Sequence, residues 1–480
     1  MLACCPMSDY GWLSILPPVL AIAMALRTRQ VYLSLFGGIL LGTTMLAGWN
    51  LLAGMALAIE QVVLVLNDHD NAEVLLFTLV VGALIVLMRE SGGVNGFANW
   101  MVARGWVRGP VSAQLISIFV GISIFIESNI TCLITGAVSR PLYDRVKLSR
   151  AKLAYMCDST SAPICILIPL NAWGAYVLVL LAAEGVENPV RTLLAAVPLN
   201  FYALSALAIV FIVALAKWNI GPMRRSEEAA LQGHSGALVR EEEALNEALR
   251  TGPDGTRSGP PERAINLMLP VVVTVLFMPL SLWITGDGSI LAGSGSTSVL
   301  WSVSAGVAVA MISYRLQGLF DFGELTELTI KGFRELVGLA AILALALALG
   351  GVCRALGTGP WVAHSVAPWI TPATVAPLIF LTGAVVAFST GSSWGTFAIL
   401  FPIAIPMATA VGASLALTTA AVMGGGVFGD HCSPISDTTV ISSLSAGVDH
   451  IEHVVTQIPY ALIGGVAATL LYFVAGLLLG

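Results

Sequence analysis

Long, uninterrupted apolar runs are the feature that most constrains the fold of this chain. Residues Phe201 to Ala216 and Ile458 to Leu479 are two such runs, and neither contains a charged residue. Runs of this kind are typical of helices that cross a lipid bilayer, because a helix satisfies its backbone hydrogen bonds internally. A transmembrane β-barrel would instead show short segments of alternating hydrophobicity. The sequence therefore predicts an all-α polytopic membrane protein.

The composition supports this prediction and excludes several classes of function. Charged residues make up 10% of the 480 residues, whereas soluble domains average about 25%. The net charge of −6 is spread over loops and one linker, so nucleic-acid binding is not expected. The sequence has no nucleophile–base pair and no cofactor motif, so we expect neither an enzyme nor a bound cofactor. Membrane lipid is the expected partner, and a homodimer is left open.

One long polar segment, from Lys217 to Arg263, divides the apolar chain. It is rich in glycine and proline, which is typical of a linker that joins two halves passively. Basic residues at both of its ends place it in the cytoplasm by the positive-inside rule. Both termini are then predicted outside a bacterial cytoplasmic (inner) membrane. The predicted units are membrane repeat 1 (1–216), a cytoplasmic linker (217–264) and membrane repeat 2 (265–480).

The order of elements in the two halves predicts an inverted repeat. Two apolar arms, 110–126 and 130–142, meet at polar residues and have basic residues at both outer ends. This pattern favours a re-entrant hairpin, with two short crossings as the alternative. A charge-free stretch, 370–414, has the equivalent place in the second half, which starts from the opposite side. We therefore predict two inverted repeats, each of about five transmembrane helices plus a re-entrant hairpin, with broken helices at the midplane.

Three acids lie in apolar segments that proline interrupts: Asp158 beside Pro163, and Asp430 and Asp437 on either side of Pro434. An ionisable side chain at membrane depth costs at least about 2.5–3.5 kcal/mol and normally lines a polar cavity. An interrupted helix also frees carbonyl oxygens, and hard cations prefer oxygen ligands. The pattern predicts a Na⁺ site at these acids. The alternative is that one of them only caps a helix.

Hydroxyl and amide groups near these acids and at the hairpin tips complete the predicted ion- or substrate-binding set, unless the hydroxyls only bond to their own helix. These residues are Ser128, Asn129, Thr131, Ser159, Thr160, Ser392, Ser393, Thr396 and Ser433. The candidates for proton coupling are Glu127, Asp430 and His431, with a purely structural hydrogen bond as the alternative for the histidine.

Four further ionisable residues are placed outside this set. His450 and His453 are expected in a solvated loop that titrates near neutrality. Arg89 and Arg354 follow apolar helices at equivalent positions of the two halves. Each is expected to be an ion-pair anchor, a snorkelling group or a ligand for a carboxylate substrate.

The segment from Gly429 to Thr439, GDHCSPISDTT, resembles the signature of the NhaC family of sodium/proton antiporters. The blocks Asp449-His450, Gln457–Tyr460, Ser149–Tyr155 and Gly391–Thr396 are similar to other parts of that family. The resemblance implies the ion-transporter superfamily fold, in which two inverted repeats bring hairpin tips and broken helices together. The chain departs from the family at Glu127-Ser128-Asn129, where members often have consecutive acids, and this leaves the role of Glu127 open.

The predicted function is secondary active exchange of Na⁺ for H⁺ by competition at buried carboxylates. Transported Na⁺ and H⁺ are then the partners. Because the resemblance also covers exchangers of carboxylates such as malate and lactate, a coupled carrier of a small organic anion or amino acid is the alternative. An ion channel is a more distant one.

Overall fold

The computed structural model describes residues 10–28, 30–93, 96–97, 100, 109–125, 128–169, 171–232, 261–289, 293–358, 361 and 370–479. Over these ranges the regular secondary structure is helical and contains no strand. By length and composition, eight helices of the described chain can cross a membrane. The prediction of an all-α polytopic membrane protein agrees with this architecture.

The first half contains helices of very different lengths. They are η1 (Gly11–Ile15), α1 (Leu16–Thr28), α2 (Val31–Leu46), α3 (Leu51–Leu64), η2 (Val65–Asn67), α4 (His69–Glu90), α6 (Pro110–Ser123), α7 (Ser128–Arg145), α8 (Arg150–Ser159), α9 (Ala162–Leu167), α10 (Ala172–Ala183), α11 (Pro189–Ala196), η3 (Val197–Leu199) and α12 (Phe201–Ala216).

The linker region and the second half contribute the remaining helices. They are α13 (Pro222–Leu231), α15 (Ile265–Thr285), α16 (Gly295–Leu316), α17 (Phe322–Ala355), α19 (Pro372–Thr390), α20 (Ser393–Val411), α21 (Leu415–Cys432), α22 (Asp437–Ala446) and α23 (His450–Leu479).

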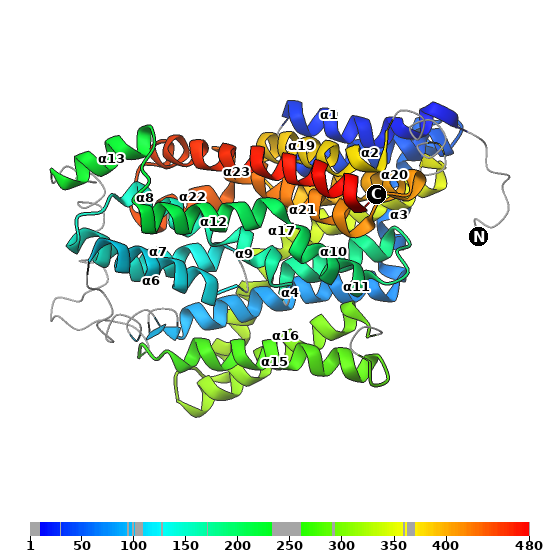
Figure 1. Ribbon diagram of the computed structural model, residues 1–480. Coiled ribbons are helices and arrows are strands. Elements are labelled where there is room, and N and C mark those ends of the chain that lie inside the picture. Colours follow the sequence, from blue (N-terminus) through cyan, green and yellow to red (C-terminus); the bar gives the residue numbers. More distant parts are fainter. Residues whose placement is uncertain are drawn as a thin grey trace.

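Helices of the two halves interleave, and most run lengthwise through the molecule (Figure 1). α4 packs along α17, and α15 and α16 pack on α4. α1 and α2 pack on the opposite side, where α2 contacts α17. α21 contacts α19, α20 and α23, while α22 contacts α7 and α8. The helices that carry the predicted acids therefore lie beside elements of both halves.

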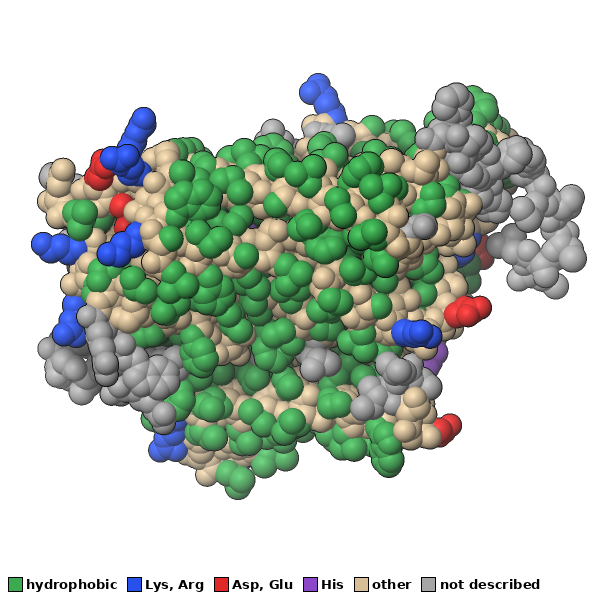
Figure 2. All heavy atoms as spheres, viewed as in Figure 1, with side chains coloured by type: hydrophobic (Ala, Val, Ile, Leu, Met, Phe, Trp, Pro, Cys, Tyr) green, Lys and Arg blue, Asp and Glu red, His purple; other side chains and the backbone are tan. Residues whose placement is uncertain are grey.

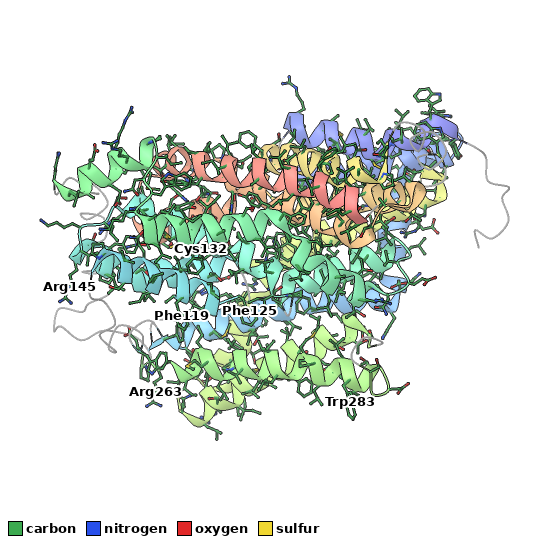
Figure 3. All side chains as sticks on the ribbon, in the orientation of Figure 1. Phe119, Phe125, Cys132, Arg145, Arg263 and Trp283 are labelled. Carbon is green, nitrogen blue, oxygen red and sulfur yellow. The ribbon has the colours of Figure 1, made fainter. Side chains whose placement is uncertain are left out.

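The surface has the polarity expected of a membrane protein. Hydrophobic side chains cover the middle of the face in Figure 2, and most of the visible Lys and Arg side chains lie at the end that carries α13. Arg145 at the end of α7 and Arg263 just before α15 lie at this same end, whereas Trp283 lies near the opposite end of α15 (Figure 3). We call the end with Arg145 and Arg263 the basic end.

Two segments stop and restart as helices next to the predicted acids. α8 ends at Ser159, and α9 resumes at Ala162 with Pro163 in its first turn. Proline is well tolerated there because the first amides of a helix have no intrahelical partner. α21 ends at Cys432, and α22 begins at Asp437 after Ser436, whose hydroxyl caps it by accepting from the Thr439 amide. Backbone groups of both interruptions are thereby brought to the level of the acids.

The two predicted hairpins differ in construction. α6 and α7 pack together and are joined across residues 124–127, of which 126 and 127 lie outside the described residues. α19 and α20 meet at Gly391, whose φ of +65° favours glycine. A Cβ there would lie 2.6 Å from the Ile435 carbonyl oxygen, so the turn packs directly on the segment between α21 and α22. Both α19 and α20 are long enough to cross a membrane.

The segment predicted as a passive linker contains a docked helix. Glu227 of α13 accepts hydrogen bonds from the Ser149 amide (2.8 Å) and from Lys152 Nζ (2.6 Å) at the start of α8. The amide of Ile220 donates to the hydroxyl of Tyr460 on α23 (3.0 Å). The described part of the linker therefore holds α8 and α23 together at the basic end, which differs from the expected passive join.

Candidate functional site

Asp158, in the last turn of α8, is fully buried among polar groups from three other elements. Its Oδ2 accepts hydrogen bonds from Gln457 Nε2 at 2.6 Å and from Thr439 Oγ1 at 3.3 Å. His431 Nε2 lies 3.8 Å from Oδ1, and His453 Nε2 lies 4.0 Å from Oδ2. One carboxylate oxygen is thus fixed by two donors, with two imidazoles beside it.

Asp430, in the last turn of α21, is also buried, and the hydroxyls of Ser393 and Ser436 interact with its carboxylate. Ser393 Oγ lies 3.0 Å from its Oδ2 and 3.2 Å from the Gly426 carbonyl oxygen. Ser393 is the first residue of α20, so the α19–α20 turn delivers this hydroxyl to the acid. Asp430 also interacts electrostatically with Asp158 and Asp437, which places the three acids in one region.

Asp437 differs from the other two acids because its side chain is exposed. It is the first residue of α22, and its Oδ1 accepts from the Thr438 amide at 2.9 Å. The side chain of Asn129 at the start of α7 interacts with this carboxylate. Asp437 therefore takes part in starting a helix, which is close to the helix-capping role given above as the alternative. It also forms the accessible edge of the acid cluster.

Three buried oxygens in this region receive no hydrogen bond from the described residues: Asp158 Oδ1, Asp430 Oδ1 and Asn129 Oδ1. They come from α8, α21 and α7. Buried polar atoms are nearly always paired, so such a set needs a physical reason. All three are acceptors, and a cation is the kind of species that acceptor-only groups can bind.

Carboxylates alone do not complete a cation site in this conformation. Within the described ranges, no three His, Cys, Asp or Glu side chains are grouped closely enough to hold a metal ion. A cation between these helices would therefore take amide and hydroxyl oxygens as well as carboxylate oxygens, and Asn129 and Ser393 supply such groups next to the acids.

Most of the other predicted hydroxyls bond to backbone oxygens. Thr160 donates to the Met156 carbonyl (2.7 Å) and Thr396 to the Ser392 carbonyl (2.8 Å). Thr131 donates to the Ile124 carbonyl and Ser433 to the Phe388 carbonyl. Ser392 instead caps α20, and Ser128 is buried at the start of α7. Glu127 lies outside the described residues.

Of the histidines near the acids, His453 is not placed as the sequence predicted. His453 is fully buried, so its expected position in a solvated loop is wrong. The reason is that α23 already begins at His450, so that His453 lies inside its first turn and faces the acid cluster. His431 bridges two helices, because its Nδ1 lies 3.1 Å from the Tyr202 hydroxyl and its Nε2 lies 3.1 Å from the Asp158 carbonyl oxygen.

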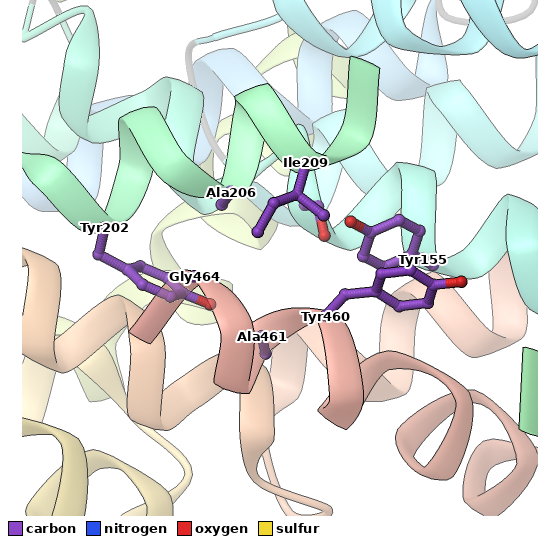
Figure 4. A pocket seen from close by; sticks show the side chains of 8 residues that line it. Tyr155, Tyr202, Ala206, Ile209, Tyr460, Ala461 and Gly464 are labelled. Carbon is purple, nitrogen blue, oxygen red and sulfur yellow. The ribbon is translucent and has the colours of Figure 1, made fainter. Parts of the chain in front are cut away.

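A small cavity opens beside this cluster between α8, α12 and α23 (Figure 4). Tyr155 and Tyr460 stack along it with ring centroids 4.8 Å apart. Tyr202 and Ser159 also line it. Because Tyr202 also contacts His431, the cavity and the acid cluster share a wall. Ser159, predicted as a ligand from the sequence, thus faces this cavity.

Arg89 and Arg354 both anchor helices through acids, which is one of the roles predicted for them. Arg89 forms two hydrogen bonds with Glu335, at 2.6 and 3.2 Å, and so joins α4 to α17. Arg354 of α17 donates to the Ala183 carbonyl and lies 3.5 Å from Glu184 at the end of α10. Burial raises the pKa of the Glu184 carboxyl to about 7, although the nearby guanidinium lowers it.

Gln457, Thr439, His453 and Tyr202 belong to the site but were not predicted as site residues. Gln457 and Thr439 stood inside sequence blocks that resemble the NhaC family, and Gln457 follows His453 by one helical turn. That spacing was an available signal for a shared helix face. Tyr202 gave no such signal, because it lies in an ordinary apolar run.

Comparisons with known proteins give a consistent picture. The sequence model of the Na⁺/H⁺ antiporter family matches residues 180–477. An uncharacterized protein of Haemophilus influenzae is 35% identical over 96% of this chain and 90% of its own length. The arginine/ornithine antiporter ArcD of Halobacterium salinarum is 37% identical over 25% of each chain.

Among solved structures, MtrF of Neisseria gonorrhoeae, described as one of a class of antimetabolite efflux pumps, has a similar fold. The TM-score is 0.54 at 14% sequence identity, over 89% of this chain and 85% of MtrF.

Proposed function

The chain is a multi-pass membrane protein that belongs to the Na⁺/H⁺ antiporter family, and we propose that it exchanges Na⁺ for H⁺ across a bacterial cytoplasmic membrane. The observation that carries this proposal is the set of unpaired acceptor oxygens on Asp158, Asp430 and Asn129. Buried acceptors without donors suit a transported cation that occupies the site for part of the cycle.

Competition at the carboxylates couples the two ions. A carboxylate that binds Na⁺ must be ionised, because a protonated carboxyl is a poor cation ligand. Na⁺ contacts Asp158 and Asp430, and Asp437, at the accessible edge, exchanges ions with the aqueous side. A proton that arrives at these acids releases Na⁺, and loss of the proton restores the site. Asn129 and Ser393 supply the uncharged oxygens.

The proposed topology follows from the positions of the helix interruptions. The α8–α9 and α21–α22 interruptions are the broken helices of two inverted repeats, and the α6–α7 and α19–α20 pairs are their hairpins. The basic end faces the cytoplasm, and both termini lie outside. Alternating access moves the hairpin and broken-helix elements against α4, α15, α16 and α17. The fold similarity to MtrF supports a transporter scaffold but does not indicate which substrate is transported.

A coupled carrier of an organic solute is the second candidate. The similarity to an arginine/ornithine antiporter over a quarter of the chain favours an amino acid, and the tyrosine-lined cavity lies next to the acids. In this case, the cavity widens during the cycle to admit the solute, and Na⁺ or H⁺ supplies the driving force.

Flux through purified protein in proteoliposomes separates the candidates. We expect a Na⁺ gradient to change the internal pH, reported by a trapped pH-sensitive dye, without any organic solute. A pH change that requires added arginine, ornithine or malate would replace Na⁺/H⁺ exchange by the organic carrier. Saturable ²²Na⁺ counterflow is also expected, because a carrier alternates between its two openings. Flux that increases linearly with Na⁺ would indicate a channel.

A further inference from the structure

Gln457 connects the three helices that meet at the acid cluster. It lies on α23 and is buried. Its Nε2 donates to Asp158 Oδ2 at 2.6 Å and to the His431 carbonyl oxygen of α21 at 2.8 Å. Its Oε1 lies 2.9 Å from His453 Nε2. One amide thus contacts the acid of α8, the residue after the acid of α21, and its own helix.

The partners fix which way this amide points. An amide nitrogen carries two hydrogens and an amide oxygen carries none. Since both partners of Nε2 are acceptors, a carboxylate and a carbonyl, only the nitrogen can face them. The oxygen must then face His453 Nε2, which must carry a hydrogen. Removing that donor would leave Oε1 buried and unpaired, so His453 holds the Gln457 amide in its orientation.

The orientation of the Gln457 amide determines which oxygen of Asp158 is left without a donor. The amide and Thr439 both donate to Oδ2, which leaves Oδ1 as the oxygen without a donor. Through the His431 carbonyl, the same amide also holds the last turn of α21, where Asp430 lies. We propose that Gln457, locked by His453, is a positioning residue that presents Asp158 Oδ1 to the transported cation in fixed relation to Asp430. This inference rests on the proposed Na⁺/H⁺ exchange and assigns a residue to its affinity for Na⁺.

The first test shortens the side chain. In Gln457→Asn the amide is one methylene shorter and cannot reach both acceptors. We expect the half-saturating Na⁺ concentration of exchange in proteoliposomes to rise about tenfold or more, because a hydrogen bond to a charged group is lost. The maximal rate should change less than about threefold. Gln114→Asn is the matched control, because Gln114 is equally buried and its amide donates to the Pro110 carbonyl, away from the acids.

The second test acts through His453 and leaves Gln457 in place. His453→Ala removes the donor that orients the amide, so it should raise the half-saturating Na⁺ concentration as Gln457→Asn does. His453→Gln carries an amide nitrogen near the position of Nε2, so it should restore a value near that of the wild type. A His453→Ala/Gln457→Asn double variant should be no worse than the more impaired single variant, because both act on one interaction.

The outcomes distinguish a failure of this inference from a failure of the proposed Na⁺/H⁺ exchange. Wild-type protein without Na⁺-dependent flux would refute the proposed exchange. Wild-type flux with an unchanged half-saturating Na⁺ concentration in Gln457→Asn would refute only the role of Gln457. Equal impairment in His453→Ala and His453→Gln would refute the locking role of His453. If Gln457→Asn does not fold, the two His453 variants decide the question, since they keep the amide.

Discussion

Asp158 and Asp430 occupy similar places at the ends of interrupted helices, but their surroundings differ. Asp158 Oδ2 receives two hydrogen bonds, and two histidines lie within 4.0 Å of its carboxylate. The Asp430 carboxylate interacts with the hydroxyls of Ser393 and Ser436, and the Ser393 hydroxyl also has the Gly426 carbonyl as an acceptor. Each acid leaves its other oxygen without a donor. Asp158 is thus held by an amide and a hydroxyl beside two imidazoles, whereas the side-chain donors at Asp430 are hydroxyls.

The difference indicates a division of labour between the acids. A carboxylate with several donors keeps its orientation whatever the cation does. A carboxylate whose donor has a second acceptor loses less when it changes its partner. We therefore expect Asp158 to shape the site and Asp430 to be the acid at which Na⁺ and H⁺ exchange. Three predictions test this comparison, and a fourth concerns an acid outside the cluster.

The largest effect should come from Asp430→Asn. Asparagine has nearly the same shape but cannot ionise, so it cannot exchange a proton for Na⁺. Na⁺-dependent H⁺ flux should fall at least about 100-fold while folded protein is still recovered from the membrane. Asp287→Asn is the control, because Asp287 lies at φ +49° in a turn after α15, where asparagine is well tolerated. Transport near the wild-type level in Asp430→Asn would refute the proposed exchange site.

Truncation of the two acids should affect stability in opposite ways. Asp158→Ala leaves the Thr439 hydroxyl and one of the two hydrogens on Gln457 Nε2 without an acceptor, and each such loss costs about 1–3 kcal/mol. Asp430→Ala leaves Ser393 with the Gly426 carbonyl as its acceptor and removes a polar group whose burial is costly. In detergent, the unfolding temperature should fall clearly for Asp158→Ala and stay level or rise for Asp430→Ala. Equal losses in both variants would remove the distinction between the acids.

Removing one hydroxyl at each acid gives a smaller contrast. Ser393→Ala removes the hydroxyl beside Asp430, and we expect the half-saturating Na⁺ concentration to rise about tenfold. Thr439→Val removes a longer contact from Asp158, where Gln457 still donates, and should change it about twofold. Paired flux measurements over a range of Na⁺ concentrations check the order, and a larger effect of Thr439→Val would reverse the comparison.

The smallest effect concerns an acid outside the cluster. Burial raises the pKa of Glu184 from its ordinary value of 4.5 to about 7. The folded protein then binds more protons at this carboxyl than the unfolded chain does, so its contribution to stability falls as the pH rises from about 4.5 to about 7. Glu184→Gln should flatten the unfolding temperature over this interval. An unchanged pH dependence in Glu184→Gln would assign the effect to other groups.

The apolar runs were sufficient to predict an all-α membrane protein, because this signal is local in the chain. The pairing of Ser393 with Asp430 could not be predicted, since it depends on how the α19–α20 turn packs on α21. The same holds for Gln457, which reaches Asp158 across 299 positions. Its block was visible in the sequence, but its partner was not.

The fate of His453 shows a second limit. Charged and histidine residues near a helix start are often solvated, and Asp449 and Glu452 are indeed exposed. The side chain one position farther on turns inward because α23 packs on α8 and α22. Helical periodicity could have distinguished the buried His453 from the exposed Glu452 only if the start of α23 had been known.

The contact of Glu227 with α8 has a consequence for biogenesis. The Ser149 amide and the Lys152 ammonium group lie 78 and 75 positions before the carboxylate that they bind. The ribosome therefore synthesises α8, which has Asp158 near its C-terminal end, well before it synthesises Glu227, the partner of the N-terminal end of α8. The first half can be fully inserted while Lys152 still has no carboxylate partner, and α8 gains this partner only when the linker emerges. Chain truncations that end before Glu227 should therefore be recognised by membrane quality control even though all preceding helices are present.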